Sequence, residues 1–416
     1  MPIEYRPILE DEFVHFATAA VGAFGTAMSG QDLRAERSAI EFDRTLAAFE
    51  KGRIVGTTAT LTLDVTLPGG RALPAGGLTW TGVLPTHRRQ GVLKTMVEAQ
   101  LQGSALREEP LSILQASEST IYGRFGYGAA TYELGFSIDT AHSAYRQDVG
   151  GVSDRGSFEA LQADCVAEVL PPLFQRLRPV FPGAVGRTPG LWSTYLADPE
   201  HEREGASALF HVVHRGDDGS ADGYVSYRVK SDWVGGIPDS TLIVHDVLAP
   251  GPEVYAALWR YCLDVDLVAT VSTVWAPVDE PLRWLLADPR RLRVNRLNDG
   301  LWLRILDVPA ALAAREYGGG HGGGRGESGD GAQGRAGGDA LVLDIADAFR
   351  PATAERYLLE AGPDGAACCR TMRPPGAPLE VTRIPGQGRR DPPVVYISSG
   401  SSRSSAIENT GPSTHT

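Results

Sequence analysis

Cysteine is scarce in this sequence, and its spacing does not suit a metal site. The chain of 416 residues has only four cysteines, which are Cys165, Cys262, Cys368 and Cys369. Tetrahedral zinc sites and disulfide frameworks need other spacings. His201 is followed by Glu202, but no second histidine stands at the offset of a zinc-protease motif. We therefore expect free thiols in a reducing compartment and no metal.

Long apolar runs and excess positive charge are also missing. No apolar run approaches the ~18 residues that would span a bilayer, so we expect no membrane partner. Residues 14–28 are mostly apolar, but acidic residues precede them, whereas a secretory signal begins with basic residues. We expect a buried helix there and a cytoplasmic protein. The net charge of -12 argues against a nucleic-acid partner; it can attract polyamines or aminoglycosides, or simply keep the protein soluble.

What is present is an alternation of strands and helices, in a chain long enough for two or three domains. A helix is predicted over residues 91–102 from its apolar spacing, and helical turns over 117–122. The strands predicted around them are residues 45–50, 53–63, 73–83, 111–115 and 132–138. This order is typical of an α/β domain.

From residue 157 the element order begins again, which predicts a duplicated α/β domain. The expected elements are a helix over 158–177, a hairpin of 208–215 and 223–230, strands at 242–248, 269–276 and 301–308, and helices at 253–264 and 282–287. More than half of residues 318–338 are glycine, so a flexible linker is expected. Strands at 340–345 and 356–360 follow, and the polar composition after Met372 predicts disorder.

The segment that carries the clearest chemistry is VLPTHRRQGVLK, residues 83–94. It joins a strand end to a helix start, where unpaired N–H groups and a partial positive charge occur. Gly91 leaves room for a ligand beside the backbone. Four basic side chains add charge, namely His87, Arg88, Arg89 and Lys94. These features suit a pyrophosphate, although a basic loop with an ordinary turn glycine has the same pattern.

A second informative segment is QASESTIYGRFGYG, residues 115–128. It follows a buried strand, and its glycines predict a sharp return into the next strand. Tyr122 and Tyr127 are candidates for proton donation near a leaving group. Either tyrosine could instead be a packing residue with a hydrogen-bonded hydroxyl.

These segments resemble the GNAT superfamily of N-acetyltransferases, and in detail its Eis (enhanced intracellular survival) branch. NDGLWLRILDVPAAL, residues 298–312, is also similar to that branch, and the resemblance covers roughly residues 1–365. It implies an α/β (α+β) fold with two tandem GNAT-like mixed-sheet domains and an incomplete sterol-carrier-like α+β domain. The bounds we predict are 1–145, 155–316, a linker at 317–338, the third domain at 339–397 and a disordered tail at 398–416.

The resemblance also implies an N-acetyltransferase with acetyl-CoA as cosubstrate. Tyr122 would protonate the departing thiolate, and the terminal carboxylate, here that of Thr416, would be the general base. Acetyl-CoA would lie against the strand end Thr81, Gly82 and Val83, the turn Arg89, Gln90, Gly91, Val92, Leu93 and Lys94, and the pair Ser117 and Glu118. The chain departs from the family pattern after Met372, so we expect a replaced or frame-shifted end.

Several functions remain open on the sequence alone. The leading one is acetylation of aminoglycosides or other polycationic amines, with a protein lysine, a polyamine or a small biosynthetic amine as other acceptors. A CoA-binding protein with a disabled C-terminus, or a carrier of a hydrophobic ligand, is the alternative class. The resemblance implies a homo-oligomer, commonly a hexamer. The acceptor pocket is expected near residues 24–32 and Trp80, unless Phe24 and Trp80 belong to the core.

Overall fold

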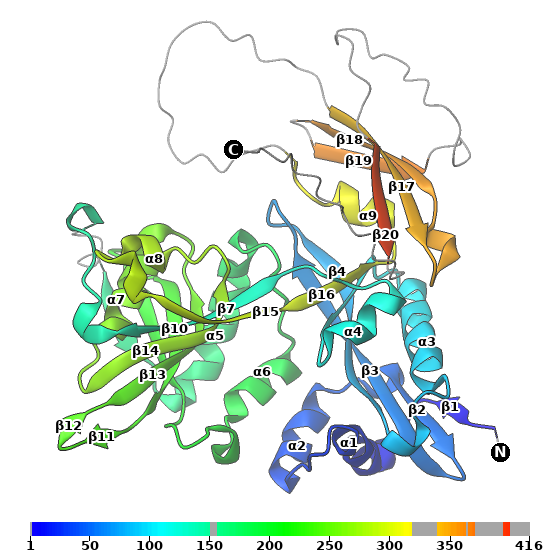
Figure 1. Ribbon diagram of the computed structural model, residues 1–416, viewed down its shortest axis with the longest axis horizontal. Coiled ribbons are helices and arrows are strands. Elements are labelled where there is room, and N and C mark those ends of the chain that lie inside the picture. Colours follow the sequence, from blue (N-terminus) through cyan, green and yellow to red (C-terminus); the bar gives the residue numbers. More distant parts are fainter. Residues whose placement is uncertain (1, 150–155, 318–338, 363–364, 371–393, 400–416) are drawn as a thin grey trace, which may run out of the picture.

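The computed structural model describes residues 2–149, 156–317, 339–362, 365–370 and 394–399 (Figure 1). Two seven-stranded mixed sheets and a smaller four-stranded sheet form its framework. The predicted α/β class is confirmed, and the two large sheets correspond to the predicted duplication. No helix in the described ranges is long and apolar enough to cross a membrane. All four cysteines lie in these ranges and are free thiols.

The first sheet holds the two sequence segments with predicted chemistry. Its order is β1 (Glu4–Arg6), β2 (Thr45–Glu50), β3 (Arg53–Thr66), β4 (Ala72–Val83), β5 (Leu111–Gln115), β16 (Leu301–Ile305) and β6 (Gly128–Ala129). Its helices are α1 (Phe13–Gly22), α2 (Gly30–Ala39), α3 (Val92–Leu106) and the short α4 (Ser119–Tyr122). Helix α3 buries Val92 and Met96 against the sheet residues Ala48 and Val55, as its apolar spacing predicts.

The second sheet has its own core under helix α7. Its order is β15 (Arg293–Asp299), β7 (Tyr132–Asp139), β14 (Val268–Pro277), β13 (Ser240–Leu248), β10 (Ala221–Lys230), β9 (Phe210–Arg215) and β8 (Ser157–Ala160). Its helices are α5 (Ala163–Leu177), α6 (Pro189–Ala197), α7 (Pro252–Leu263) and α8 (Leu282–Leu285). Trp259 of α7 is fully buried against Phe136 of β7, with ring centroids 5.4 Å apart.

The two large sheets exchange strands, which the sequence did not predict. Strand β7 was expected to complete the first domain, but it lies in the second sheet between β14 and β15. Strand β16 comes from the second half of the chain and lies in the first sheet between β5 and β6. Both strands have the predicted type. Their sheet membership was wrong because strand pairing is decided by distant segments.

Several element boundaries differ from the prediction, and two of them have a clear cause. The helix expected over 158–177 begins only at Ala163, because Ser157 and Phe158 pair as a strand with Arg215 and His214 of β9. The strand expected over 301–308 ends at Ile305, and helix α9 (Val308–Ala313) follows. The Asp307 carboxylate caps α9 by accepting a 2.9 Å hydrogen bond from the Ala310 amide.

The C-terminal region forms a separate sheet beside α9 (Figure 1). Its order is β19 (Gly365–Arg370), β18 (Arg356–Gly362), β17 (Asp339–Asp347) and β20 (Val394–Ser399), with β20 parallel to β17. Strands β17 and β18 confirm the two predicted strands. The disorder predicted after Met372 was wrong for β20, which pairs with β17 and also extends past the predicted boundary at 397. The predicted linker at 318–338 and residues 400–416 of the predicted tail lie outside the described residues. The sterol-carrier likeness stays a prediction.

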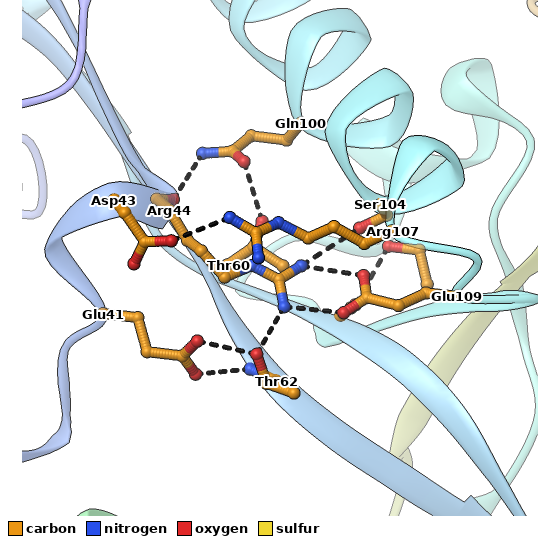
Figure 2. A network of polar contacts seen from close by, with 11 residues as sticks. Glu41, Asp43, Arg44, Thr60, Thr62, Gln100, Ser104, Arg107 and Glu109 are labelled. Carbon is orange, nitrogen blue, oxygen red and sulfur yellow. Dashed lines mark hydrogen bonds and ion pairs between the residues drawn. The ribbon is translucent and has the colours of Figure 1, made fainter.

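A buried ion pair joins four parts of the first domain (Figure 2). Arg44, just before β2, contacts Glu109 with an N–O distance of 2.6 Å, and their side chains are only 3% and 5% exposed. The Arg44 guanidinium also donates to Thr62 of β3 at 2.6 Å and to Ser104 of α3 at 3.4 Å. A buried charge without its partner is strongly unfavourable, so this pair specifies how the helix, the strands and the loop before β5 meet.

Replacing one partner of this pair tests that role. We expect Glu109→Gln to lower the free energy of unfolding by about 3 kcal/mol, because the Arg44 charge stays buried without a counter-charge. Urea unfolding measures the loss. The matched control is Asp43→Asn, which removes the exposed partner of Arg107 in the same network and should leave stability nearly unchanged. An equal loss in both variants would contradict this role.

Candidate active site

Strands β4 and β5 separate after a short parallel contact. They pair only at Ala75–Leu111, Gly76–Ser112 and Gly77–Ile113. Beyond this point β4 continues to Val83 paired with β3 alone, and the end of β5 pairs with β16. Among the described residues, the far half of β4 therefore has no strand on its β5 side. Backbone N–H and C=O groups at such an edge can pair with an extended ligand.

A β-bulge lies in this open half of β4. Thr57 of β3 faces Gly82 and Ala59 faces Thr79, so Trp80 and Thr81 together oppose a single residue of β3. Trp80 takes a positive φ of 53°, and its carbonyl accepts a 2.8 Å hydrogen bond from Thr57 Oγ1. Bulges of this kind redirect the backbone next to functional sites.

The Trp80 side chain packs on helix α1. Its ring packs at 6.1 Å from Phe13 and 6.0 Å from Phe16, both fully buried residues of α1. Trp80 is half-buried and packs against the core under α1, so it makes the contacts of the core alternative while part of its side chain stays exposed. Its role in an acceptor pocket stays a prediction. Phe24, for which the sequence also left a pocket role or a core role open, lies just after α1 and is 56% exposed.

Tyr122 ends α4 at the mouth of the β4–β5 separation. Its side chain is buried, and this burial raises the pKa of its hydroxyl above the ordinary value of 10. The nearby Thr81 hydroxyl opposes this rise of the Tyr122 pKa, and the negative charge of Glu118 adds to it. Tyr122 is therefore held as a neutral phenol next to the open half of β4.

Tyr127 is placed differently, although it was an equal candidate in the sequence. Its hydroxyl lies 2.7 Å from Ser112 Oγ inside the sheet, and burial raises its pKa far above the ordinary range. Its ring packs edge-on against that of Tyr122, with centroids 6.1 Å apart. Tyr127 is thus the packing residue with a hydrogen-bonded hydroxyl that the sequence allowed for either tyrosine. Of the two tyrosines, Tyr122 is the one beside Thr81.

The turn between β4 and α3 has the geometry expected of a phosphate-binding loop. Arg89 and Gly91 both adopt positive φ, 62° and 85°, and Gly91 is the residue directly before helix α3. A Cβ at Gly91 would meet nothing within 4 Å, so the approach to the first amides of α3 is open. The Val92 side chain is fully buried, which leaves only its backbone for a ligand.

The four basic side chains of this turn divide into two pairs. Arg88 donates to the carbonyls of Val83 at 3.2 Å and Ala23 at 2.8 Å, which ties the loop to the end of α1. His87 lies 3.3 Å from the Glu50 carboxylate. Arg89 and Lys94 are exposed. Two of the four predicted cations thus position the loop, and two are left for a ligand.

Ser117 and Glu118 line a cleft of about 500 Å³ between the end of β5 and the second sheet. Its lining is Gln115, Ala116, Ser117, Glu118, Ser119, Thr120, Glu133, Trp275, Arg296, Asn298, Asp299 and Gly300. Burial raises the pKa of Glu133, and the charge of Arg296 partly opposes this. The sequence did not point to Glu133, Trp275 or Asp299, because only the exchange of β7 brings their strands to β5.

Comparison with known proteins identifies the family. Residues 4–130 and 183–305 each match the family model of the acetyltransferase (GNAT) domain. The protein named N-acetyltransferase Eis of Mycobacterium tuberculosis is 32% identical over 326 residues, which are 74% of this chain and 75% of that protein. The chain belongs to the Eis family of GNAT N-acetyltransferases. The family confirms the two tandem GNAT domains, and enzymes with this domain use acetyl-CoA.

Further Eis-family similarity extends over most of the chain. An uncharacterized N-acetyltransferase of Streptomyces avermitilis is 36% identical over 373 residues, which are 89% of this chain and 86% of that protein. The crystal structure of Eis1 from Mycobacterium abscessus has a TM-score of 0.71 at 30% identity and covers 90% of this chain and 86% of its own. The enzyme class predicted from the sequence, an N-acetyltransferase, is confirmed.

His201 and Glu202, for which the sequence predicted no metal site, come together with an aspartate in the fold. His201 and Glu202 meet Asp32 of α2, and one ligand-type atom of each lies within 4.8 Å of the others. His201 Nε2 is 3.1 Å from the Asp32 carboxylate. The same carboxylate accepts a 2.9 Å hydrogen bond from the Ser29 amide and caps α2. These contacts account for the group as a link between α2 and the second domain.

Every predicted site residue except one lies in the described part of this Eis-family chain. The exception is Thr416, the predicted general base, which is outside the described residues. The structure brings Thr81 and Tyr122 into contact, and it places Glu118 near enough to raise the Tyr122 pKa. The open part of β4 ends at Val83, and the turn around Gly91 follows it and leads into α3.

A glycine pair tests the turn as a ligand site. Gly91 and Gly52 both have positive φ, and a Cβ at either would meet nothing within 4 Å. We expect Gly91→Ala and Gly52→Ala each to lower stability by about 1 kcal/mol, the cost of a side chain in this conformation. Only Gly91→Ala should weaken acetyl-CoA binding, by about tenfold, as measured by isothermal titration calorimetry. Equal affinity in both variants would remove Gly91 from the cosubstrate site.

Proposed function

We propose that this chain transfers the acetyl group of acetyl-CoA to a primary amine of a polycationic small molecule, such as an aminoglycoside. The observation that carries the proposal is the neutral, buried Tyr122 beside Thr81, at the open edge of β4. A strand edge, an anion-binding turn and a proton donor are the three parts that acyl transfer from a thioester requires. The chain supplies them along the second half of β4 and in the two segments beside it, the turn before α3 and the short helix α4.

The cosubstrate suits this strand edge and turn by the chemistry of its parts. Acetyl-CoA supplies a thioester whose carbonyl carbon the amine attacks. The open backbone edge of Thr81, Gly82 and Val83 pairs with the amide groups of the pantetheine arm. The first amides of α3 and the residues Arg89 to Lys94 hold the pyrophosphate.

Proton transfer is the task of the side chains around α4. The new C–N bond forms as the C–S bond breaks, and the sulfur leaves with the bonding electron pair. Tyr122 donates its hydroxyl proton to that sulfur, which releases CoA as a thiol. The amine must lose a proton to a base. By resemblance this base is the carboxylate of the last residue, Thr416.

The acceptor is inferred from charge. Glu118, Glu133 and Asp299 line the cleft next to α4, and the whole chain carries a net charge of -12. Carboxylates in a partly enclosed cleft attract a cation that carries several amines more strongly than a single amine. Arg296, whose guanidinium lies 5.8 Å from the Trp275 ring, is the one basic side chain in the lining of this cleft, so the three carboxylates outnumber it.

We also propose the setting in which the enzyme works. Its four free thiols suit a reducing compartment, so we place it in the cytoplasm. By resemblance to the Eis branch, the active form is a homo-oligomer, a hexamer, and the four-stranded C-terminal sheet is a sterol-carrier-like domain.

The first test measures the free CoA thiol released during turnover. We expect release with multi-amine sugars, and weaker release with a lysine peptide and with polyamines. Tyr122→Phe should lower kcat by about 100-fold, because the leaving sulfur loses its proton donor. The control is Tyr127→Phe, which removes a second buried hydroxyl, the one bonded to Ser112, and should leave kcat within a few-fold.

Two outcomes would oppose this function. If no amine releases thiol while acetyl-CoA still binds, the chain is a CoA-binding protein. If Tyr122→Phe and Tyr127→Phe slow turnover equally, Tyr122 is not the proton donor.

The pH dependence gives an independent test of Tyr122. Its pKa is raised above 10 by burial, so the hydroxyl keeps its proton throughout the neutral and mildly alkaline range. We expect kcat/KM for the amine to rise with pH as the free amine accumulates, and to fall only above pH 10. A fall near pH 8 in the wild-type profile would contradict Tyr122 as the acid. The alkaline fall should be absent from the Tyr122→Phe profile.

A further inference from the structure

A buried arginine connects the Tyr122 turn to the C-terminal sheet. Arg304 of β16 is 1% exposed. Its Nη1 donates to the carbonyl of Phe125, three residues after Tyr122, and its Nη2 lies 2.5 Å from Asp347 Oδ2 at the end of β17. One guanidinium thus contacts both the turn that follows α4 and a carboxylate of the third sheet.

The turn is shaped around this guanidinium. Gly126 has a positive φ of 80°, and a Cβ there would lie 1.5 Å from Arg304 Nη1, so no other residue fits. The Gly126 amide donates to the Gly123 carbonyl at 3.0 Å, and the Tyr127 amide donates to the Tyr122 carbonyl at 3.3 Å. The backbone on which Tyr122 sits is closed directly over Arg304.

Asp347 is held in place on its own side. It accepts hydrogen bonds from Thr353 Oγ1 at 2.6 Å and from the amides of Phe349 and Arg350 at 3.1 and 2.8 Å. Burial alone would raise the pKa of Asp347, but these bonds and the Arg304 charge lower it on balance. The residue is therefore a charged, oriented carboxylate.

An aromatic contact crosses the same junction. The Phe349 ring, two residues after Asp347, packs edge-on against the Phe125 ring at 5.2 Å. The guanidinium of Arg304 lies 5.7 Å from the Phe349 ring. The C-terminal sheet thus contacts the turn through an ion pair and through apolar packing.

We propose that Arg304 and Asp347 are positioning residues for Tyr122, and that the C-terminal sheet holds the proton donor in place through this ion pair. The inference rests on the proposed function, because it assigns Tyr122 as the donor. Neither residue touches the reacting atoms. A donor must stay within a few tenths of an ångström of its proton acceptor, and the groups that orient it typically contribute tenfold or more to the rate.

The same strand offers a matched control. Asp344 lies three residues before Asp347 on β17 and contacts Arg356 of β18 at 2.5 Å, with side chains 19% and 6% exposed. This pair has the same chemistry, but it joins two strands of one sheet, and the Asp344 side chain is more exposed than that of Asp347, at 19% against 6%. Asp344→Asn therefore reports the loss of an ion pair in the third sheet without loss of the contact to the turn.

Amide hydrogen exchange tests the structural half of the proposal without any turnover. We expect Asp347→Asn to accelerate exchange at Gly126 and Tyr127 at least tenfold, because their turn loses its support. Asp344→Asn should leave both amides at the wild-type rate. Unchanged exchange in Asp347→Asn, or equal acceleration in both variants, would overturn the proposal. Thr353→Val, which removes one bond to Asp347, replaces Asp347→Asn if that variant does not fold.

Kinetics tests the functional half. Asp347→Asn should lower kcat about tenfold with the KM for acetyl-CoA within twofold, and Asp347→Glu should restore most of kcat. In a Tyr122→Phe background, Asp347→Asn should have no further effect, because both changes act through one hydroxyl. If Asp347→Asn lowers kcat by the same factor in the Tyr122→Phe background as in the wild type, the loss is a general one of stability, and the positioning role is overturned.

The two proposals fail in different ways. Absence of thiol release by the wild-type protein rejects the proposed function, and hydrogen exchange then still decides whether the ion pair holds the turn. If the wild-type protein turns over normally, and Asp347→Asn and Tyr122→Phe lower kcat independently of each other, only the positioning role is rejected.

Discussion

The pairing of β5 is the constraint on which the site and the domain junction both depend. β5 shares three residue pairs with β4 and five with β16. Because β4 continues past that short contact, its far half keeps an open edge on the β5 side. Because β16 covers the other edge of β5, a strand from the second half of the chain completes the first sheet. One five-residue strand thus leaves the edge of β4 open and joins the two GNAT domains.

The exchange of β7 and β16 also determines which side chains meet. Glu118 follows β5, whereas Glu133 and Asp299 belong to the neighbouring strands β7 and β15 of the second sheet. They line one cleft only because β7 leaves the first domain and β16 returns to it. The second GNAT domain therefore contributes walls to a cleft that Ser119 and Thr120 of α4 also line, and it is more than a spacer.

Buried ion pairs fix the contacts between elements that apolar packing alone would leave adjustable. Arg44 and Glu109 align the sheet, α3 and the loop before β5, while Arg304 and Asp347 align the third sheet with the turn after α4. Such pairs add little net stability relative to apolar residues, but their geometry allows few alternative arrangements. Both pairs connect segments far apart in the sequence.

The sequence by itself determined the local structure and the family. Apolar spacing predicted α3, the glycines predicted the turns after Tyr122 and around Gly91, and the motifs identified the N-acetyltransferase class, since each of these depends on a few neighbouring residues. Only the tertiary structure decided that β7 and β16 change sheets, that Trp80 packs against Phe13 of α1, and that Tyr122, not Tyr127, lies beside Thr81. Strand partners and ion pairs are chosen among distant segments by hydrogen-bond register and burial, and a single sequence carries no local signal for that choice.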